Sequence, residues 1–400
     1  MDWKALKLCA LSDLRGDKSL GFLSYLNKNI LYTMRVIVLG GGFGGVEVAI
    51  ELRKRSKELD IIMIDRRARL EYQAAHPEIL SGKVTPDEIS GDLNKFAAKI
   101  GAEFIHDTVV NMDFKAKKVN TGDDGREISY DFLVIAIGAE QTFFGIPGAE
   151  ELSRSVNTLK GAIATKNALD QLDYSKKINI AVIGAGLTGV EVAGELNDYF
   201  EDRGAHAKLY LVEMMPGILP AFPKENVANL VAKSLADRGV EILTETAVQE
   251  VDEKAITFKD GRKRPYDLLI WTAGIKPNSL LEQLNLPKER GWLKVDPFLR
   301  VTEDVFAVGD TIYFERDGVR SGQNVEEAER QGKVAAANII RTIKGVRLKR
   351  YRPKNTIQNP RAFLSLGSDK AVMYFNGRVF KIFAYRLKKF VERRYMKRFR

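Results

Sequence analysis

The sequence is poor in sulfur and in imidazole: its 400 residues include one cysteine, Cys9, and three histidines. One thiol cannot form an intramolecular redox disulfide, a C-x-x-C pair or a thiolate zinc site. His76, His106 and His206 stand far apart, which is the pattern of ordinary polar positions rather than of metal ligands. The chain is therefore expected to work without a metal and without a redox-active thiol.

Long apolar runs are missing as well. No stretch of about eighteen uncharged apolar residues occurs, so a membrane-spanning helix is not expected. Residues 1–33 contain Asp2, Asp13 and Asp17 and no compact apolar run, so a secretory signal is not expected either. This N-terminal extension fits a helical segment or an upstream start codon, and the sequence does not choose between them.

Positive charge is present in excess but is unevenly placed. The formal net charge is +10, and residues 378–400 hold ten Lys and Arg residues against Glu392 alone, which makes +9. The basicity belongs to the end of the chain and leaves the preceding residues nearly neutral.

Two glycine fingerprints are the most informative feature. The apolar run Val36–Leu39 leads into Gly40–Gly45, and Ile180–Ile183 leads into Gly184–Gly189. Each has the G-x-G-x-x-G spacing of a strand-to-helix turn, where glycines let backbone amides approach a pyrophosphate at a helix N-terminus. One such turn occurs in many α/β units, whereas two indicate a chain that holds two dinucleotides.

Each fingerprint is followed by a strand that ends in an acid. Asp65 closes Ile61–Ile64 and Glu213 closes Leu209–Val212. A carboxylate about twenty residues beyond the glycines is typically bound to a ribose diol and repels a 2′-phosphate. Glu213 is followed by Met214 rather than by an arginine, so the second site is expected to prefer NADH over NADPH.

The two halves repeat one plan. Strand-like segments follow each acid, and the repeat closes on Tyr130–Gly138 in the first half and Tyr266–Gly274 in the second. A further strand, Asp304–Val308, ends in Gly309 and Asp310, where a carboxylate could accept a hydrogen bond from a ribityl hydroxyl. The pattern predicts an α/β protein with two Rossmann-like dinucleotide-binding domains.

Residues 34–345 resemble the two-dinucleotide-binding-domain flavoproteins, and within them the type II NADH:quinone oxidoreductases. The similarity lies in 184–196 with Glu191 and Glu195, in 211–220, and in 267–274. It implies an FAD domain at 34–155 and 274–345, an inserted NADH domain at 156–273, and a membrane-association region at 346–400.

The resemblance also implies which residues bind the cofactors. For FAD they are Gly40, Gly42, Phe43, Gly44, Gly45, Asp65, Arg66, Gly138, Gly309, Asp310 and Ala328. For NADH they are Gly184, Gly186, Leu187, Thr188, Gly189, Glu213 and Gly274. Glu191 would lie near the junction of nicotinamide and flavin, as an orienting or proton-handling catalytic group. A carboxylate that only complements the helix dipole is the alternative.

The acceptor side departs from the family pattern. Members carry an Ala-Gln-x-Ala-x-Gln stretch, and the equivalent here has Glu326 and Arg330 in place of both glutamines, followed by Gln331. Position and charge allow Glu326 and Arg330 to pair with each other. These three residues form the expected acceptor site, and the changes leave the identity of the acceptor open.

The implied reaction is ping-pong oxidation of NADH through FAD, with two electrons passed to a membrane quinone. The alternatives are a soluble NAD(P)H-flavin reductase that donates to a ferredoxin, a rubredoxin or oxygen, and a non-catalytic NADH-sensing flavoprotein. A homodimer is left open, and nucleic-acid binding is not expected because no base-reading motif accompanies the basic tail.

The tail is expected to bind a membrane. Strands are predicted at 361–366 and 371–375, followed by an Asn376–Gly377 turn, and a helix from Arg378 onward. An apolar stripe would lie among lysines and arginines, with fraying at Arg394 and Arg398. The stripe consists of Val379, Phe380, Phe383, Ala384, Leu387, Phe390 and Val391. Packing on the protein itself, on a second subunit or on an acidic redox protein are the alternatives. The missing signal favours a peripheral place on the cytoplasmic side of the cell membrane.

Overall fold

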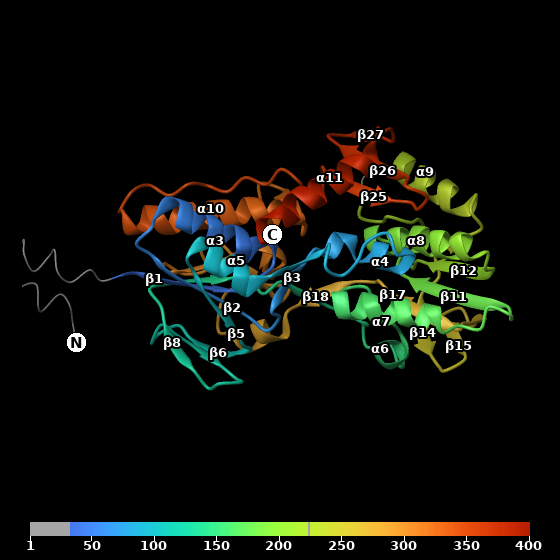
Figure 1. Ribbon diagram of the computed structural model, residues 1–400, viewed down its shortest axis with the longest axis horizontal. Helices are drawn as coiled ribbons and strands as arrows, with labels where there is room; N and C mark the ends of the chain where they lie inside the picture. The colour runs from blue at the N-terminus through green and yellow to red at the C-terminus, as the bar shows by residue number, and fades with distance from the viewer. Residues whose placement is uncertain (1–32, 223–224) are drawn as a thin grey trace, which may run out of the picture.

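A five-stranded parallel sheet forms the centre of the first unit in the computed structural model, which describes residues 33–222 and 225–400 (Figure 1). Its order is β21-β9-β1-β2-β5. The strands are β21 (Val305–Ala307), β9 (Phe132–Ile135), β1 (Arg35–Leu39), β2 (Asp60–Asp65) and β5 (Glu103–His106). Helices α3 (Phe43–Arg55), α5 (Leu93–Ile100) and α10 (Val325–Ile343) cover it. Residues 1–32 of the N-terminal extension, with Cys9, lie outside the described residues.

A four-stranded parallel sheet of order β13-β12-β11-β17 forms the second unit. Its strands are β13 (Glu241–Leu243), β12 (Ala207–Val212), β11 (Ile178–Ile183) and β17 (Leu268–Trp271). Helices α8 (Leu187–Arg203) and α7 (Leu159–Asp170) lie on opposite sides of this sheet, and α9 (Glu225–Ala236) lies beside α8 (Figure 1). The two sheets confirm the predicted α/β fold with two Rossmann-like units.

The strands are almost wholly apolar because other elements of the fold cover the sheets and bury them. In β1 the residues from Val36 to Leu39 are fully buried, and Val36 pairs with Ile61 on one side and Phe132 on the other. Strand β21 comes from beyond the second unit and returns to pair with β9. An FAD domain built from two separate segments, with the NADH domain inserted between them, would require such a returning strand. The exact domain boundaries remain a prediction.

Each unit carries an antiparallel sheet at the place where the sequence repeats. These are β6 (Val109–Asp113), β7 (Lys118–Thr121) and β8 (Glu127–Ser129) in the first, and β14 (Val248–Val251), β15 (Ala255–Phe258) and β16 (Lys263–Pro265) in the second. The linking segments between the units pair through β10 (Ala139–Gln141) and β18 (Ile275–Pro277).

Short elements complete the fold. The strands are β3 (Arg69–Glu71), β4 (Ser90–Asp92), β19 (Lys288–Glu289), β20 (Trp292–Lys294), β22 (Ile312–Tyr313), β23 (Glu315–Arg316) and β24 (Val319–Arg320). The helices are η1 (Gln73–Ala75), α4 (Pro77–Ser81), α6 (Ala149–Leu152), η2 (Ser279–Gln283) and η3 (Gly309–Thr311). In the described residues no helix combines the length and the apolar character that a bilayer crossing needs.

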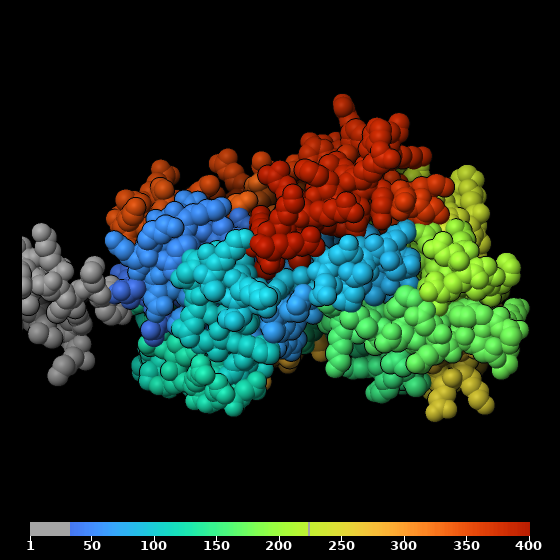
Figure 2. Space-filling view, in the orientation of Figure 1, coloured from blue at the N-terminus to red at the C-terminus, as the bar shows by residue number. Residues whose placement is uncertain are grey.

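The C-terminal segment lies over the seam between the two units (Figure 1; red in Figure 2). It consists of the sheet β25 (Ala362–Ser365), β26 (Ala371–Phe375) and β27 (Arg378–Phe380), then α11 (Ala384–Met396) and η4 (Lys397–Phe399). The predicted helix from Arg378 is wrong at its start. Asn376 and Gly377 both have positive φ, 49° and 78°, and this tight turn sends 378–380 back along β26 as a third strand.

Candidate functional site

The two fingerprints have the same backbone geometry, which explains two of their three glycines. Gly40 and Gly184 have φ values of +102° and +95°, a conformation that other residues adopt at a cost. A Cβ on Gly45 would lie 1.9 Å from the carbonyl oxygen of Gly40, and one on Gly189 would lie 1.8 Å from that of Gly184. The first glycine makes the turn, and the third lets the helix pack against it.

The middle glycines, Gly42 and Gly186, face open space. A Cβ on either would have no atom within 4 Å among those described. Each is the N-cap of the following helix, α3 or α8, and neither start is capped by a described side chain. The free N–H groups of the first turn can therefore reach a pyrophosphate. The two loops fit the phosphates of two dinucleotides.

The acid at each strand end makes equivalent contacts in the two units. Asp65 Oδ2 accepts a hydrogen bond from the backbone N–H of Gly41 at 2.6 Å, and Glu213 Oε2 accepts one from Ala185 at 2.9 Å. The other oxygen of each accepts the N–H two residues further on, at 2.7 and 3.0 Å. Both carboxylates are buried and fixed beside the glycine turn, as a ribose-binding acid must be.

A cleft of about 880 Å³ opens at the carboxyl ends of the first sheet. Ten of the eleven residues predicted to bind FAD line it; Gly45 instead packs behind Gly40. The cleft is also lined by Ser155, Asn157, Asn278, Ser279, Leu280 and Gln283. They belong to the segments that link the two units, and sequence reasoning missed them because a linker carries no local motif. The residues present fit an FAD molecule.

Asp310 and Gly309 form the far wall of this cleft. Burial raises the pKa of the Asp310 carboxyl to about 6. Gly309 has a φ of +72°, and its N–H donates to Gln331 Oε1 at 2.6 Å. Gln331 is itself buried, and its amide nitrogen donates to Ser321 Oγ and to the Tyr351 hydroxyl. The predicted role of Gln331 in the acceptor site therefore stays a prediction. In the structure its side chain stabilises the turn at Gly309.

The ion pair expected between Glu326 and Arg330 does not form. Glu326 Oε1 instead accepts a hydrogen bond from Arg361 at 2.9 Å, across to the start of the C-terminal sheet. Arg330 lies 3.4 Å from the buried carboxylate of Glu327 and donates to a backbone carbonyl of residue 352. Buried Glu327 has the greater need of a cation, and Arg361 is held in place beside Glu326.

Glu191 lies in the second turn of α8 and faces the C-terminal sheet rather than the cleft just described. Its Oε1 accepts the backbone N–H of Ser365 at 2.9 Å, and Lys388 Nζ is 3.6 Å away. Burial raises the pKa of Glu191 to about 7, against the opposing effect of Lys388. Its predicted catalytic role remains a proposal.

The predicted NADH residues lie around the second fingerprint. Leu187 begins α8 and is 42% exposed, and Thr188 is exposed beside it. Gly274 has a φ of +73° and lies under the ring of Phe144, so close that a Cβ would be 2.4 Å from it. The structure thus brings the exposed start of α8, Glu213 and Gly274 to the carboxyl ends of the second sheet.

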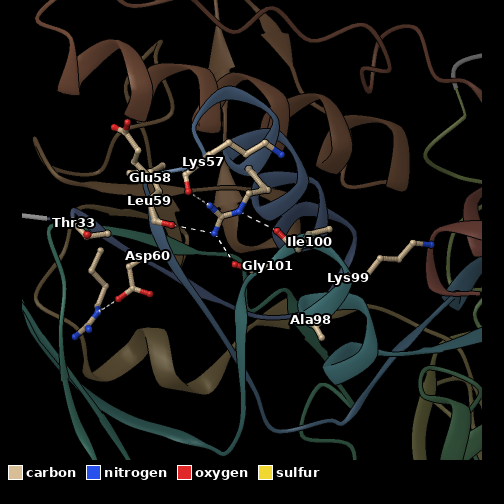
Figure 3. Close-up of a pocket in the computed structure, with 11 residues that line it drawn as sticks. Thr33, Lys57, Glu58, Leu59, Asp60, Ala98, Lys99, Ile100 and Gly101 are labelled. Carbon is tan, nitrogen blue, oxygen red and sulfur yellow. Dashed lines mark hydrogen bonds and ion pairs between the residues drawn. The ribbon is translucent and has the colours of Figure 1, made fainter. Parts of the chain in front are cut away.

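A second cleft, of about 890 Å³, lies at the opposite edge of the first sheet (Figure 3). Its centre is Arg53, whose guanidinium donates to four backbone carbonyl oxygens at 2.6 to 3.0 Å. Parallel sheets bind ligands at their carboxyl ends, and this cleft lies at the amino ends. Arg53 ties the loops together there and offers no binding chemistry of its own.

Two parallel sheets with a fingerprint and an acidic strand end each, and one cleft shared with the linkers, define a flavoprotein with two dinucleotide-binding units. The chain belongs to the pyridine nucleotide-disulphide oxidoreductase family, whose model matches residues 34–332. Its single cysteine means that the disulfide in the family's name has no counterpart within this chain.

Relatives narrow the similarity. The chain is 31% identical to demethylphylloquinone reductase NdbB of Synechocystis over 85% of its length and 86% of that protein. It is 30% identical to the type II NADH:quinone oxidoreductase of Staphylococcus aureus, over 78% and 83%. The sulfide:quinone oxidoreductase of Aquifex aeolicus has the same fold, with a TM-score of 0.80 over 92% of both chains at 22% identity. The predicted resemblance to type II NADH:quinone oxidoreductases, and with it FAD and NADH as cofactors, is confirmed.

Proposed function

We propose that this protein oxidises NADH through bound FAD and reduces a quinone. NADH, a proton and the quinone become NAD⁺ and the quinol, so that two electrons and two protons reach the acceptor. FAD supplies this two-electron chemistry when it is bound. The observation that carries the proposal is the pair of equivalent fingerprints, each with its fixed acid. The relatives support it, since both are named for the reduction of a quinone rather than of a small redox protein.

The residues of the chain bind and orient the reactants. The turn at Gly40 and the helix start at Gly42 accept one pyrophosphate, and Asp65 accepts a ribose. Glu213 binds the other ribose and disfavours a 2′-phosphate, so that NADH is preferred to NADPH. Asp310 lines the cleft, where its carboxylate could accept a hydrogen bond from a ribityl hydroxyl of FAD, and Glu191 is the group that could hold or move a proton at its carboxylate oxygens.

Steady-state kinetics test the proposal. Purified protein with FAD is expected to oxidise NADH much faster than NADPH when a quinone is present, and to transfer electrons to several quinones at different rates. The flavin absorbance should bleach on addition of NADH without quinone and return when quinone is added. A flavin that NADH does not reduce, or that only a ferredoxin or rubredoxin reoxidises, would contradict the proposal.

We further infer that the outer face of α11 binds a membrane surface. Apolar side chains that are 40% to 81% exposed gather at the start of this helix and along it, namely Phe380, Ile382, Phe383, Leu387, Phe390 and Val391. Seven exposed cations surround them: Arg378, Lys381, Arg386, Arg393, Arg394, Lys397 and Arg400. An apolar face among cations is suited to anionic lipid. The cytoplasmic side and a homodimer remain predictions of the sequence.

The inner face of α11 corrects part of the sequence expectation. Lys388 and Lys389 belong to the basic run that is expected to surround the apolar stripe, but both bind Glu78 and Glu392 inside the protein. Arg398 does not fray, since it pairs with Glu47 at 2.7 Å. These residues are held because Glu78 and Glu47 are buried and need a cation.

Replacing Phe383 and Phe390 by serine should weaken membrane binding. The two rings are 68% and 60% exposed, and loss of their transfer to lipid is worth roughly 2–3 kcal/mol, about 30- to 150-fold in partitioning. Sedimentation with anionic vesicles measures it. Val346→Ser, at a 47% exposed site beyond α10, is the matched control and should sediment like the parent. Equal sedimentation of the double variant would contradict the inference, and turnover with a soluble dye should stay within about twofold.

A further inference from the structure

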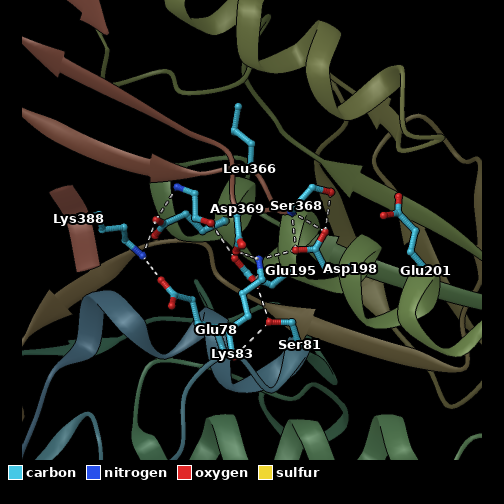
Figure 4. A network of polar contacts seen from close by, with 12 residues as sticks. Glu78, Ser81, Lys83, Glu195, Asp198, Glu201, Leu366, Ser368, Asp369 and Lys388 are labelled. Carbon is cyan, nitrogen blue, oxygen red and sulfur yellow. Dashed lines mark hydrogen bonds and ion pairs between the residues drawn. The ribbon is translucent and has the colours of Figure 1, made fainter. Parts of the chain in front are cut away.

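Two buried carboxylates lie side by side on α8, three residues apart. Glu195 is fully buried and Asp198 is 5% exposed (Figure 4). Neither faces the cleft, and nothing in the proposed reaction uses them. Carboxylates in such a place are costly unless charged or hydrogen-bonding partners surround them.

Glu195 joins two other parts of the chain. Its Oε2 accepts a hydrogen bond from Ser81 Oγ at 2.6 Å and lies 3.1 Å from Lys83 Nζ, both at the end of α4 in the first unit. Its Oε1 accepts a hydrogen bond from Ser365 Oγ at 2.7 Å, at the end of β25. One side chain of the second unit is therefore bound both to the first unit and to the C-terminal sheet.

Asp198 joins the same three parts. Lys83 Nζ lies 2.5 Å from its Oδ2, and Arg238 Nη2 lies 2.6 Å from its Oδ1. The backbone N–H of Ser368, in the β25–β26 turn, donates to both oxygens at 2.8 and 2.6 Å. We call Ser81, Lys83, Glu195, Asp198, Arg238, Ser365 and Ser368 the junction.

The backbones also touch at the junction. A Cβ on Gly194 would lie 2.6 Å from the carbonyl carbon of Leu366, and one on Gly367, whose φ is +77°, would lie 2.4 Å from the Gly194 oxygen. Helix α8 and the turn are therefore in direct backbone contact. A small displacement at this place cannot be absorbed by side chains alone.

The junction is connected along the chain to both predicted dinucleotide sites. Helix α8 runs unbroken from Leu187 to Arg203, so Asp198 is joined by a rigid rod of about 16 Å to the turn that receives NADH. Lys83 follows α4 and η1, and Gln73 at the start of η1 lines the FAD cleft. The junction thus connects the helix that holds one dinucleotide with the wall that holds the other.

We propose that Lys83, Glu195 and Asp198 are positioning residues that set the distance between the nicotinamide and the flavin rings. The inference rests on the proposed NADH oxidation. Transfer between the two rings needs an approach of about 3–3.5 Å, and a misplacement of about 1 Å can cost about 100-fold in rate. A junction that fixes one nucleotide-binding unit against the other controls that approach.

Lys83 and Asp198 keep their charges at neutral pH. Burial alone would lower the pKa of Lys83, but Glu195 and Asp198 outweigh it and the pKa is raised. Burial alone would raise the pKa of Asp198, but Lys83, Ser368 and Arg238 outweigh it and the pKa is lowered. The ion pair between Lys83 and Asp198 is therefore present at the neutral pH at which NADH oxidation would be measured.

Lys83→Met tests the proposal, because it removes the ion pairs of Lys83 with Glu195 and Asp198, while Ser81 still donates to Glu195 and Arg238 still pairs with Asp198. Flavin reduction by saturating NADH, followed by stopped flow, should slow about 10- to 100-fold. The dissociation constant of ADP-ribose, measured by calorimetry, should change less than about threefold. The long-wavelength absorbance of stacked NAD⁺ and reduced flavin should fall, and the isotope effect with deuterated NADH should rise. Lys83→Arg should restore most of the rate.

Lys233→Met is the matched control, since Lys233 is 77% exposed on α9 and pairs with Asp237. Hydrogen exchange at the Ser368 amide shows independently that the junction has loosened. Faster exchange with a reduction rate within twofold of the parent would overturn the proposal. Ser81→Ala is the second variant, to be used if Lys83→Met loses FAD. It removes a single hydrogen bond to Glu195, and the same measurements then test the proposal. A parent protein whose flavin NADH does not reduce would contradict the proposed function instead.

Discussion

Gly189→Val is expected to give a protein that keeps FAD and no longer binds NADH. The new Cβ would lie 1.8 Å from the Gly184 oxygen and 2.8 Å from Thr272 Oγ1, so the fingerprint turn and the start of α8 must separate. Loss of more than about 4 kcal/mol of binding free energy, or about 1,000-fold in affinity, follows from the disrupted turn. Calorimetry with ADP-ribose on the FAD-loaded protein measures the affinity, and the flavin absorbance measures FAD.

The other glycines provide the comparison. Gly186→Ala places a Cβ in open space at a φ of −71°, so the melting temperature should not change, while NADH binding weakens because the pyrophosphate can no longer approach. Gly45→Val should abolish FAD binding in the same way, because its Cβ would lie 1.9 Å from the Gly40 oxygen. Parental NADH affinity in Gly189→Val would contradict the assignment of the second fingerprint.

The fold and the cofactor loops could be predicted because their signals are local. A glycine fingerprint, its preceding strand and its acid all lie within about thirty residues, and each glycine has its own steric reason. The repeated closing strands at Tyr130 and Tyr266 made the doubled architecture visible. The structure adds that Asp65 and Glu213 make the same pair of backbone contacts.

Partners from distant parts of the chain could not be predicted. Helical periodicity shows that α11 has two faces but does not show which one meets the protein. Its inner face carries Lys388 and Glu392, and its outer face carries Phe390 and Leu387, the reverse of the usual arrangement. The reason is Glu78, which lies 310 residues away from Lys388 and is fully buried. No local sequence pattern predicts that contact.

The acceptor residues show the same limit. Alignment with a family motif located Glu326 and Arg330, and their spacing on one helix suggested a mutual pair. In the structure Glu326 pairs with Arg361 and Arg330 pairs with Glu327. Neither pairing could be predicted from the sequence alone. The junction escaped prediction for the same reason, since Lys83 and Asp198 are 115 residues apart.

Glu191 combines a buried carboxylate with charged neighbours from several elements. Lys388 lies near it on α11, Glu78 on α4 and Glu195 one turn further along α8. Burial raises its pKa from 4.5 to about 7. The folded protein therefore binds a proton that the unfolded chain does not bind between these two pH values. The free energy of unfolding falls as pH rises through that window, by roughly 3 kcal/mol in total.

Glu191→Gln should remove the free-energy cost of burying an ionised carboxylate, and with it the pH dependence of stability that Glu191 causes. The amide oxygen can still accept the Ser365 N–H, and Lys388 keeps Glu78 and Glu392 as partners. The variant should gain stability over the parent between pH 5 and pH 8, by roughly 3 kcal/mol in urea unfolding. Turnover with quinone should fall at least about tenfold and lose an inflection near pH 7. Asp202→Asn, at an exposed acid on the same helix, should change neither quantity. An unchanged pH profile in Glu191→Gln would show that this carboxylate neither orients nor transfers a proton and only supports the fold.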